Sequence, residues 1–126
     1  MHQFSLDYLG IDNLGNGGMA KTEMLAGTLD LLVLRVLQAA PLHGFGIAER
    51  IFVLSKEVLA VEEGSLYPAL YRMEAKGWLT AEWGESERGR RAKLYSLTKA
   101  GRKQLEAEEA VWDRTSIAIR DVLKNT

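Results

Sequence analysis

Apolar side chains recur at helical spacing in three successive segments between residues 25 and 77. The first segment carries them at Leu29, Leu32, Val33, Val36 and Leu37. Thr28 is the expected N-cap of this helix, and Asp30 in its first turn suits the helix dipole. Pro41 is expected to end the helix, because the residue before a proline disfavours helical backbone.

Two more helices are predicted before residue 77. The second opens after His43 and has apolar positions at Ile47, Ala48, Ile51, Phe52 and Leu54. The third opens at Ser65, the expected N-cap, with Pro68 in the first turn, where its missing N–H costs little. Its buried stripe consists of Leu66, Leu70 and Met73. Gly77 is expected to stop this helix.

The pattern then changes to that of a β-hairpin followed by a long helix. Residues 78–83 are rich in strand formers, and residues 91–97 alternate between apolar and polar side chains. The polar segment 84–90 contains two glycines and is the expected loop between them. Thr98 is the expected N-cap of the final helix.

The order of these elements predicts a mainly α fold with a small β-hairpin. Three helices followed by a two-stranded ribbon are typical of a winged helix-turn-helix. We expect residues 21–98 to form this unit and residues 99–126 to form a long C-terminal dimerisation helix. Residues 1–20, which are rich in glycine and asparagine towards their end, are expected to be a disordered extension.

Composition narrows the chemistry available to the chain. Its 126 residues suit one domain, and the absence of cysteine excludes a disulfide scaffold, a thiolate zinc site and a cysteine nucleophile. Only two histidines are present. We therefore expect no catalytic residue, no metal site and no cofactor, and hence no enzyme. The first residues lack a basic, apolar targeting signal, so a cytoplasmic protein without a membrane segment is expected.

Basic residues gather around the predicted hairpin although the net charge is only −1. The wing residues expected to bind DNA phosphates are Arg88, Arg90, Arg91 and Lys93. A solvated loop is the alternative for the same charges. The residues of the third helix expected at the DNA are Ser65, Tyr67, Tyr71, Arg72 and Lys76. At least one of the two tyrosines is expected to be largely structural.

The final helix carries an apolar seam with a seven-residue period. Leu105, Trp112 and Ile119 are spaced by seven, and Val122 and Leu123 continue the apolar face. Packing on its own domain is one explanation for this seam. Packing on a second copy is the other, and we favour it because DNA-binding proteins commonly act as two-fold dimers.

Four motifs resemble the PadR family of transcriptional regulators. They are LAGTLDLLVLRVL at 25–37, PLHGFGIAERI at 41–51, VEEGSLYPALYRMEAKGWLTAEWG at 61–84 and RRAKLYSLTKAGRKQLEAEEAVW at 90–112. The resemblance covers roughly residues 24 to 123 and is most specific in the third motif. It implies a cytoplasmic, homodimeric winged-helix repressor of the family's branch with a short C-terminal region.

The resemblance also implies roles for individual residues. Ser65, Tyr67 and Tyr71 would lie on the recognition helix, and Arg90, Arg91 and Lys93 on the wing. Phe45 stands where the family usually has tyrosine, so a phosphate contact from a hydroxyl is not expected there. Family members often bind small aromatic effectors near the dimer interface, so such a ligand is a candidate partner beside operator DNA.

One alternative function uses the same fold without specific DNA binding. This alternative is a small-molecule sensor or a protein-interaction module. It would not need the basic cluster between Arg88 and Lys93. This cluster therefore favours the DNA-binding function over the alternative.

Overall fold

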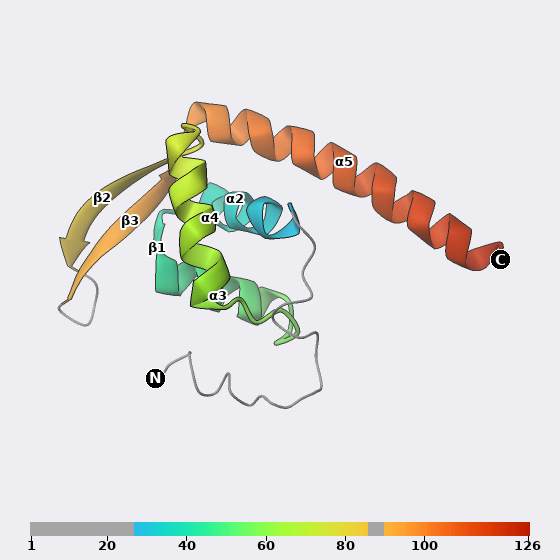
Figure 1. Cartoon of the computed structure of the whole chain (residues 1–126), viewed down its shortest axis with the longest axis horizontal. Coiled ribbons are helices and arrows are strands. Elements are labelled where there is room, and N and C mark those ends of the chain that lie inside the picture. Colours follow the sequence, from blue (N-terminus) through green and yellow to red (C-terminus); the bar gives the residue numbers. More distant parts are fainter. Residues whose placement is uncertain (1–26, 86–89) are drawn as a thin grey trace.

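The computed structural model describes residues 27–85 and 90–126 (Figure 1). The expected disordered extension at 1–20 lies outside these residues. The elements in chain order are α2 (Thr28–Ala39), β1 (Leu42–His43), α3 (Gly44–Leu54), α4 (Glu63–Ala75), β2 (Leu79–Glu85), β3 (Arg91–Leu97) and α5 (Lys99–Lys124). The mainly α fold with a small hairpin is confirmed. None of the helices within the described ranges combines the length and the apolar character that crossing a membrane requires.

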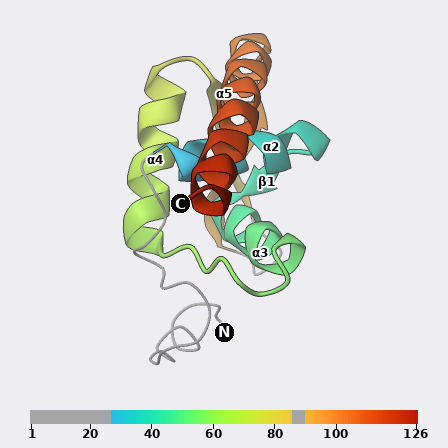
Figure 2. The ribbon, with the colours of Figure 1, turned by 90° about the vertical axis from the view of Figure 1, so that its right-hand side faces the viewer.

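The core lies where α2, α3 and α4 meet. The fully buried side chains include Leu34, Ile47, Leu66, Leu70, Met73, Leu79 and Leu105. The stripe predicted for the third helix is therefore confirmed, since all three of its residues are buried. When the molecule is viewed along α5, α4 lies on one side, α3 lies on the other, and α2 passes behind α5 between them (Figure 2).

The sheet has one strand more than the sequence predicts. The antiparallel hairpin of β2 and β3 runs in register from Leu79 opposite Leu97 to Glu85 opposite Arg91. On the other edge of β3, β1 pairs Leu42 with Tyr95 and His43 with Leu94, which gives the strand order β1-β3-β2. A strand of two residues is too short to show an alternating pattern, so the sequence did not indicate it.

Two helices begin earlier than expected, because each has a different N-cap residue from the predicted one. Gly27, with φ of +89°, caps α2, so Thr28 is the first helical residue and its predicted role as N-cap is wrong. Helix α4 begins at Glu63 after the cap Glu62, which places Ser65 inside the helix. The Glu62 carbonyl accepts bonds from the backbone N–H groups of residues 65 and 66, so the helical turn is already formed there. Pro68 therefore lies inside the helix and not in its first turn.

A compact hydrogen-bond cluster joins the end of α4 to the start of α5. Gly77, with φ of +80°, and Trp78 donate their backbone N–H groups to the carbonyls of Glu74 and Met73, which closes α4 with a Schellman motif. Thr98 Oγ1 lies 2.6 Å from the Gly77 carbonyl oxygen and accepts the Gly101 N–H at 3.0 Å. The predicted stop at Gly77 and the predicted cap at Thr98 are both confirmed.

An ion pair joins α2 to α4 across 42 residues of sequence. Arg72 donates from Nη1 to Asp30 Oδ2 at 2.7 Å and from Nη2 to Asp30 Oδ1 at 3.0 Å. Asp30 is buried, whereas about half of the Arg72 side chain is exposed. The hydrogen bonds to Asp30 are the largest cause of the raised pKa of Arg72. Asp30 thus links two helices in addition to lying in the first turn of α2.

Among the residues that the structure describes, only the first part of α5 packs against the rest of the domain. Leu105 is buried in the core, and Arg35 of α2 donates to Glu109 at 3.1 Å. Beyond this point the helix continues past the other elements to the C-terminus (Figure 1). The remaining residues of α5 are mostly exposed.

Substitution of Gly101 with alanine should destabilise the domain. A Cβ at this position would collide with the Trp78 carbonyl oxygen, which belongs to rigid backbone. We expect Gly101→Ala to lower the free energy of unfolding by about 1–3 kcal/mol. Gly64→Ala is the matched control, because a Cβ on this helical glycine meets open space, and it should raise stability by up to about 1 kcal/mol. Urea titrations at a fixed protein concentration measure both, and equal effects would contradict the packing argument.

Loss of Arg72 should also destabilise the domain, because it leaves the buried Asp30 carboxylate without its bidentate partner. We expect Arg72→Met to cost about 1–3 kcal/mol. The double variant Asp30→Asn with Arg72→Met should cost clearly less than the sum of the two single variants. A double-mutant cycle by urea denaturation measures this coupling, and strict additivity would show that the pair contributes nothing.

Candidate nucleic-acid interface

The outer face of α4 presents polar and aromatic side chains from its first three turns. Ser65 is exposed, and Tyr71 is 74% exposed. The opposite face buries Leu66 and Leu70 in the core, so the direction of the outer face is fixed by packing. This face is therefore available to a partner over much of the helix.

Tyr67 has a second contact that distinguishes it from Tyr71. It is 42% exposed, and its ring lies against Gly44 at the start of α3. A Cβ on Gly44 would lie only 2.5 Å from the Tyr67 hydroxyl oxygen and 2.7 Å from a ring carbon, so this helix contact depends on glycine. Burial raises the pKa of Tyr67, and the neighbouring Glu63 carboxylate raises it further. Tyr67 therefore combines a packing role with a partly exposed hydroxyl.

The two basic residues expected on the recognition helix lie differently. Both guanidinium arms of Arg72 bind Asp30, so the structure gives Arg72 an internal ion pair. Lys76 follows the last turn of α4, and its Nζ lies 4.8 Å from the centroid of the Trp78 ring. It is thus at the opposite end of the helix from Ser65. The sequence could not show the pairing of Arg72, because its partner lies far away in the chain.

The hairpin of β2 and β3 carries the basic residues of the predicted wing. Arg90 and Arg91 are exposed, whereas Arg88 lies outside the described residues. Lys93 is only partly exposed, and its Nζ lies 3.5 Å from Glu74 Oε1 of α4. This contact connects the wing with the recognition helix. Lys93, which was expected on the wing, therefore also has a carboxylate neighbour on α4.

An aromatic residue that the sequence analysis did not assign to the interface lies among these cations. Trp83 of β2 is opposite Lys93 in the register of the hairpin, and its ring centroid lies 4.7 Å from the Arg91 guanidinium carbon. The Lys93 Nζ lies 5.5 Å from the same centroid. Strand alternation places residues 83, 91 and 93 on one face once the register is known. Without the pairing register of β2 and β3, the sequence could not show that Trp83 lies beside these two cations.

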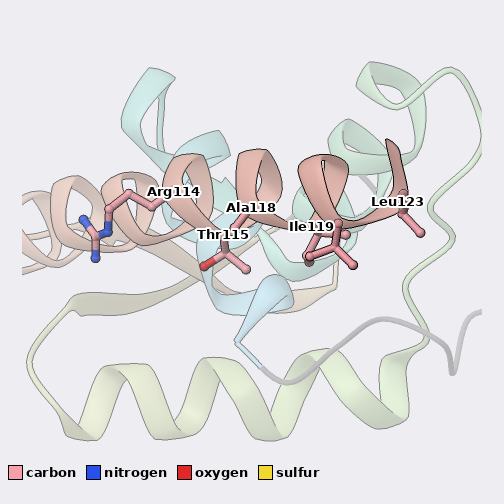
Figure 3. A pocket seen from close by; sticks show the side chains of 6 residues that line it. Arg114, Thr115, Ala118, Ile119 and Leu123 are labelled. Atoms are coloured by element: carbon pink, nitrogen blue, oxygen red, sulfur yellow. The ribbon is translucent and has the colours of Figure 1, made fainter. Parts of the chain in front are cut away.

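The far part of α5 carries an exposed apolar face. Trp112, Ile119, Val122 and Leu123 are between 47% and 73% exposed. Leu105, which was expected at the dimer interface, is 1% exposed in the core of its own domain, because the start of α5 packs there. The exposed face includes a shallow hollow lined by Arg114, Thr115, Ala118, Ile119, Val122 and Leu123 (Figure 3). All six residues belong to α5.

Groups that hold metals do not come together in the part of the chain that the structure describes. Within 27–85 and 90–126, no three histidine, aspartate or glutamate side chains form such a group. His43 is part of β1 and pairs with Leu94 across the sheet. The pairing of β1 with β3 therefore accounts for the position of His43.

Known proteins share this arrangement over most of the chain. The family model of PadR-like transcriptional regulators matches residues 33–107. A PadR-like transcriptional regulator of Bacillus cereus is 26% identical in sequence, with a TM-score of 0.69. The match covers 83% of this chain and 100% of that one.

Two further solved structures agree with this match. A PadR family regulator of Clostridium difficile is 28% identical, with a TM-score of 0.65, over 77% of this chain and 99% of its own. A PadR-like transcription factor of Bacteroides fragilis is 31% identical, with a TM-score of 0.62, over 76% of this chain and 90% of its own. The chain therefore belongs to the PadR-like family of transcriptional regulators and is a DNA-binding regulator with a winged-helix fold.

Proposed function

We propose that this regulator is a homodimeric repressor that binds a specific operator sequence. Helix α4 enters the major groove, and the wing formed by β2 and β3 binds the flanking phosphates. The observation that carries this proposal is the exposed face of α4 next to a basic hairpin. The contact between Lys93 and Glu74 supports it, because it connects the two surfaces that would meet the DNA.

Individual side chains have distinct parts in this proposal. Tyr71 is the most exposed aromatic residue of α4 and contacts base edges or the sugar-phosphate backbone. Ser65 and the partly exposed Tyr67 hydroxyl lie nearer the start of the helix, where phosphate contacts are favourable. Arg90 and Arg91 supply sequence-independent attraction to phosphates from the wing. Arg72 acts through the fold, because Asp30 holds its guanidinium.

The homodimer in this proposal rests on the free face of α5. A row of large apolar side chains on a helix that has left its own domain is a surface that a second copy would bury. A two-fold dimer also matches the two half-sites of a palindromic operator. The dimerisation residues are then Trp112, Ile119, Val122 and Leu123, without Leu105.

Repression and a small aromatic effector complete the proposal on the basis of the sequence resemblance. Trp112 gives the effector a physical basis, because an exposed indole on an apolar face is a surface on which a second ring can stack. An effector bound there would lie between the two copies of α5. Its binding would be read from a quench of tryptophan fluorescence that is lost in the Trp112→Phe variant, because Trp78 and Trp83 also fluoresce.

The DNA-binding part is tested with a duplex from upstream of the protein's own gene and with a scrambled duplex. Fluorescence anisotropy across a salt series should show binding to the first that is at least about a thousandfold tighter and that weakens steeply with salt. Tyr71→Ala should weaken operator binding by a factor of about 5 to 150, with no change in the unfolding temperature, because the ring is largely exposed. Equal binding of both duplexes would contradict a specific operator at this site.

Tyr67→Ala is the matched comparison for Tyr71→Ala. It should lower both operator affinity and the unfolding temperature, because it also removes the contact with Gly44. Thermal melts followed by circular dichroism separate the two variants. Full affinity in Tyr71→Ala would remove this residue from the interface.

The dimer is tested by placing a charge on the free face of α5. Ile119→Asp should convert the dimer to monomer at micromolar concentration, because the carboxylate would be buried against the partner without a counterion. Ile117→Asp is the matched control: residue 117 lies about 160° around the helix from residue 119 on the side away from Trp112. Light scattering after size-exclusion chromatography gives the mass of each variant. A monomeric wild-type protein, or a dimeric Ile119→Asp variant, would contradict this interface.

A further inference from the structure

Trp83 is a large aromatic side chain exposed on the wing. It is 59% exposed, although it lies in the middle of β2. Burial in the core therefore does not explain this residue. Its ring instead has two cations close to it, the Arg91 guanidinium at 4.7 Å and the Lys93 ammonium at 5.5 Å from the centroid. Both distances are within the range of attractive cation–π contacts.

The side chain of Arg91 has an acidic neighbour that it does not use. Glu85 is directly opposite Arg91 in the register of the hairpin. Among the residues that the structure describes, however, Arg91 forms no ion pair, and its guanidinium lies at the Trp83 ring. A cation–π contact with a single ring does not use up the five N–H donors of a guanidinium. An ion pair with Glu85 would occupy those donors.

Lys93 has a different role on the same ring. Its Nζ is shared between Trp83 and the Glu74 carboxylate of α4. Lys93 therefore holds the ring close to the recognition helix, and part of its own charge is neutralised. Of the two cations on this ring, Arg91 is the one without a carboxylate partner among the described residues.

We propose that Trp83 is a positioning residue for DNA binding: its ring holds the Arg91 guanidinium ready to donate to an operator phosphate. This inference rests on the proposed function, because it assumes that the wing meets the phosphate backbone. Holding the long arginine side chain in one place before binding reduces the entropy lost when the phosphate contact forms. Trp83 acts through Arg91 and makes no base contact of its own.

A double-mutant cycle tests this coupling. The variants are Trp83→Leu, Arg91→Ala and the double variant, with affinity measured by anisotropy on the upstream and the scrambled duplex across a salt series. Trp83→Leu should weaken binding two- to fivefold, as expected for the loss of one exposed cation–π contact. It should also lower the salt slope by up to about one, the value of one phosphate contact. In the Arg91→Ala background the same substitution should have no further effect.

Two further variants separate positioning from folding. Trp83→Phe keeps a ring face and should recover part of the affinity that Trp83→Leu loses. Thr80→Ala changes an exposed, uncharged residue on the other face of β2 and should leave affinity and salt slope unchanged. The unfolding temperature of Trp83→Leu should equal that of the wild type, because the side chain is mostly exposed.

The outcomes distinguish this inference from the proposed function. Additive effects of Trp83→Leu and Arg91→Ala on both duplexes would overturn the inference and would mean that the indole contacts the DNA directly. Equal binding of the two duplexes by the wild type would overturn specific operator binding. The coupling would still be expected in that case, since phosphate contacts do not depend on sequence. Absence of binding to either duplex at low salt would overturn both.

Discussion

The hydrogen bonds around Thr98 determine how the long helix α5 is arranged relative to the recognition helix α4 and the hairpin. Its side chain caps α5 through the Gly101 N–H and also contacts the Gly77 carbonyl, where α4 has just ended. Its backbone N–H donates to the Trp78 carbonyl, where the hairpin starts. One residue thus joins the end of the recognition helix, both ends of the hairpin and the start of the long helix. The direction of α5 relative to α4 follows from this cluster.

Much of the fold could be predicted from the sequence, because its signals are local. Hydrophobic spacing, a proline, a stop glycine and a capping threonine depend on neighbours within a few residues, so the second helix, the hairpin and the start of α5 were confirmed. The pairing of Arg72 with Asp30 and that of Lys93 with Glu74 bridge 42 and 19 residues. Such pairs depend on tertiary packing. Leu105 belongs to the same seam as Ile119, and only the structure shows that the domain covers one and leaves the other exposed.

Ion pairs separate the basic residues that stabilise the fold from those that are available to a partner. Arg35 binds Glu109, Arg72 binds Asp30, and Lys93 contacts Glu74, so three cations hold helices and the wing together. Arg91 instead lies at an aromatic ring and forms no ion pair within residues 27–85 and 90–126. A count of charges along the chain treats all four alike. The basic character of the wing in a protein with a net charge of −1 therefore depends on Arg90 and Arg91 more than on Lys93.

Helix α5 extends well beyond its last contact with the domain, and this length gives it the properties of a lever arm. Its 26 residues correspond to about 39 Å at about 1.5 Å per residue. A rotation of about 5° at the Thr98 cluster would move the far end by about 3 Å, because displacement grows with distance from the pivot. If two copies were joined through their far ends, the same rotation would change the separation of their recognition helices. The spacing of the two half-sites would then be controlled from a few hydrogen bonds at the base of the helix.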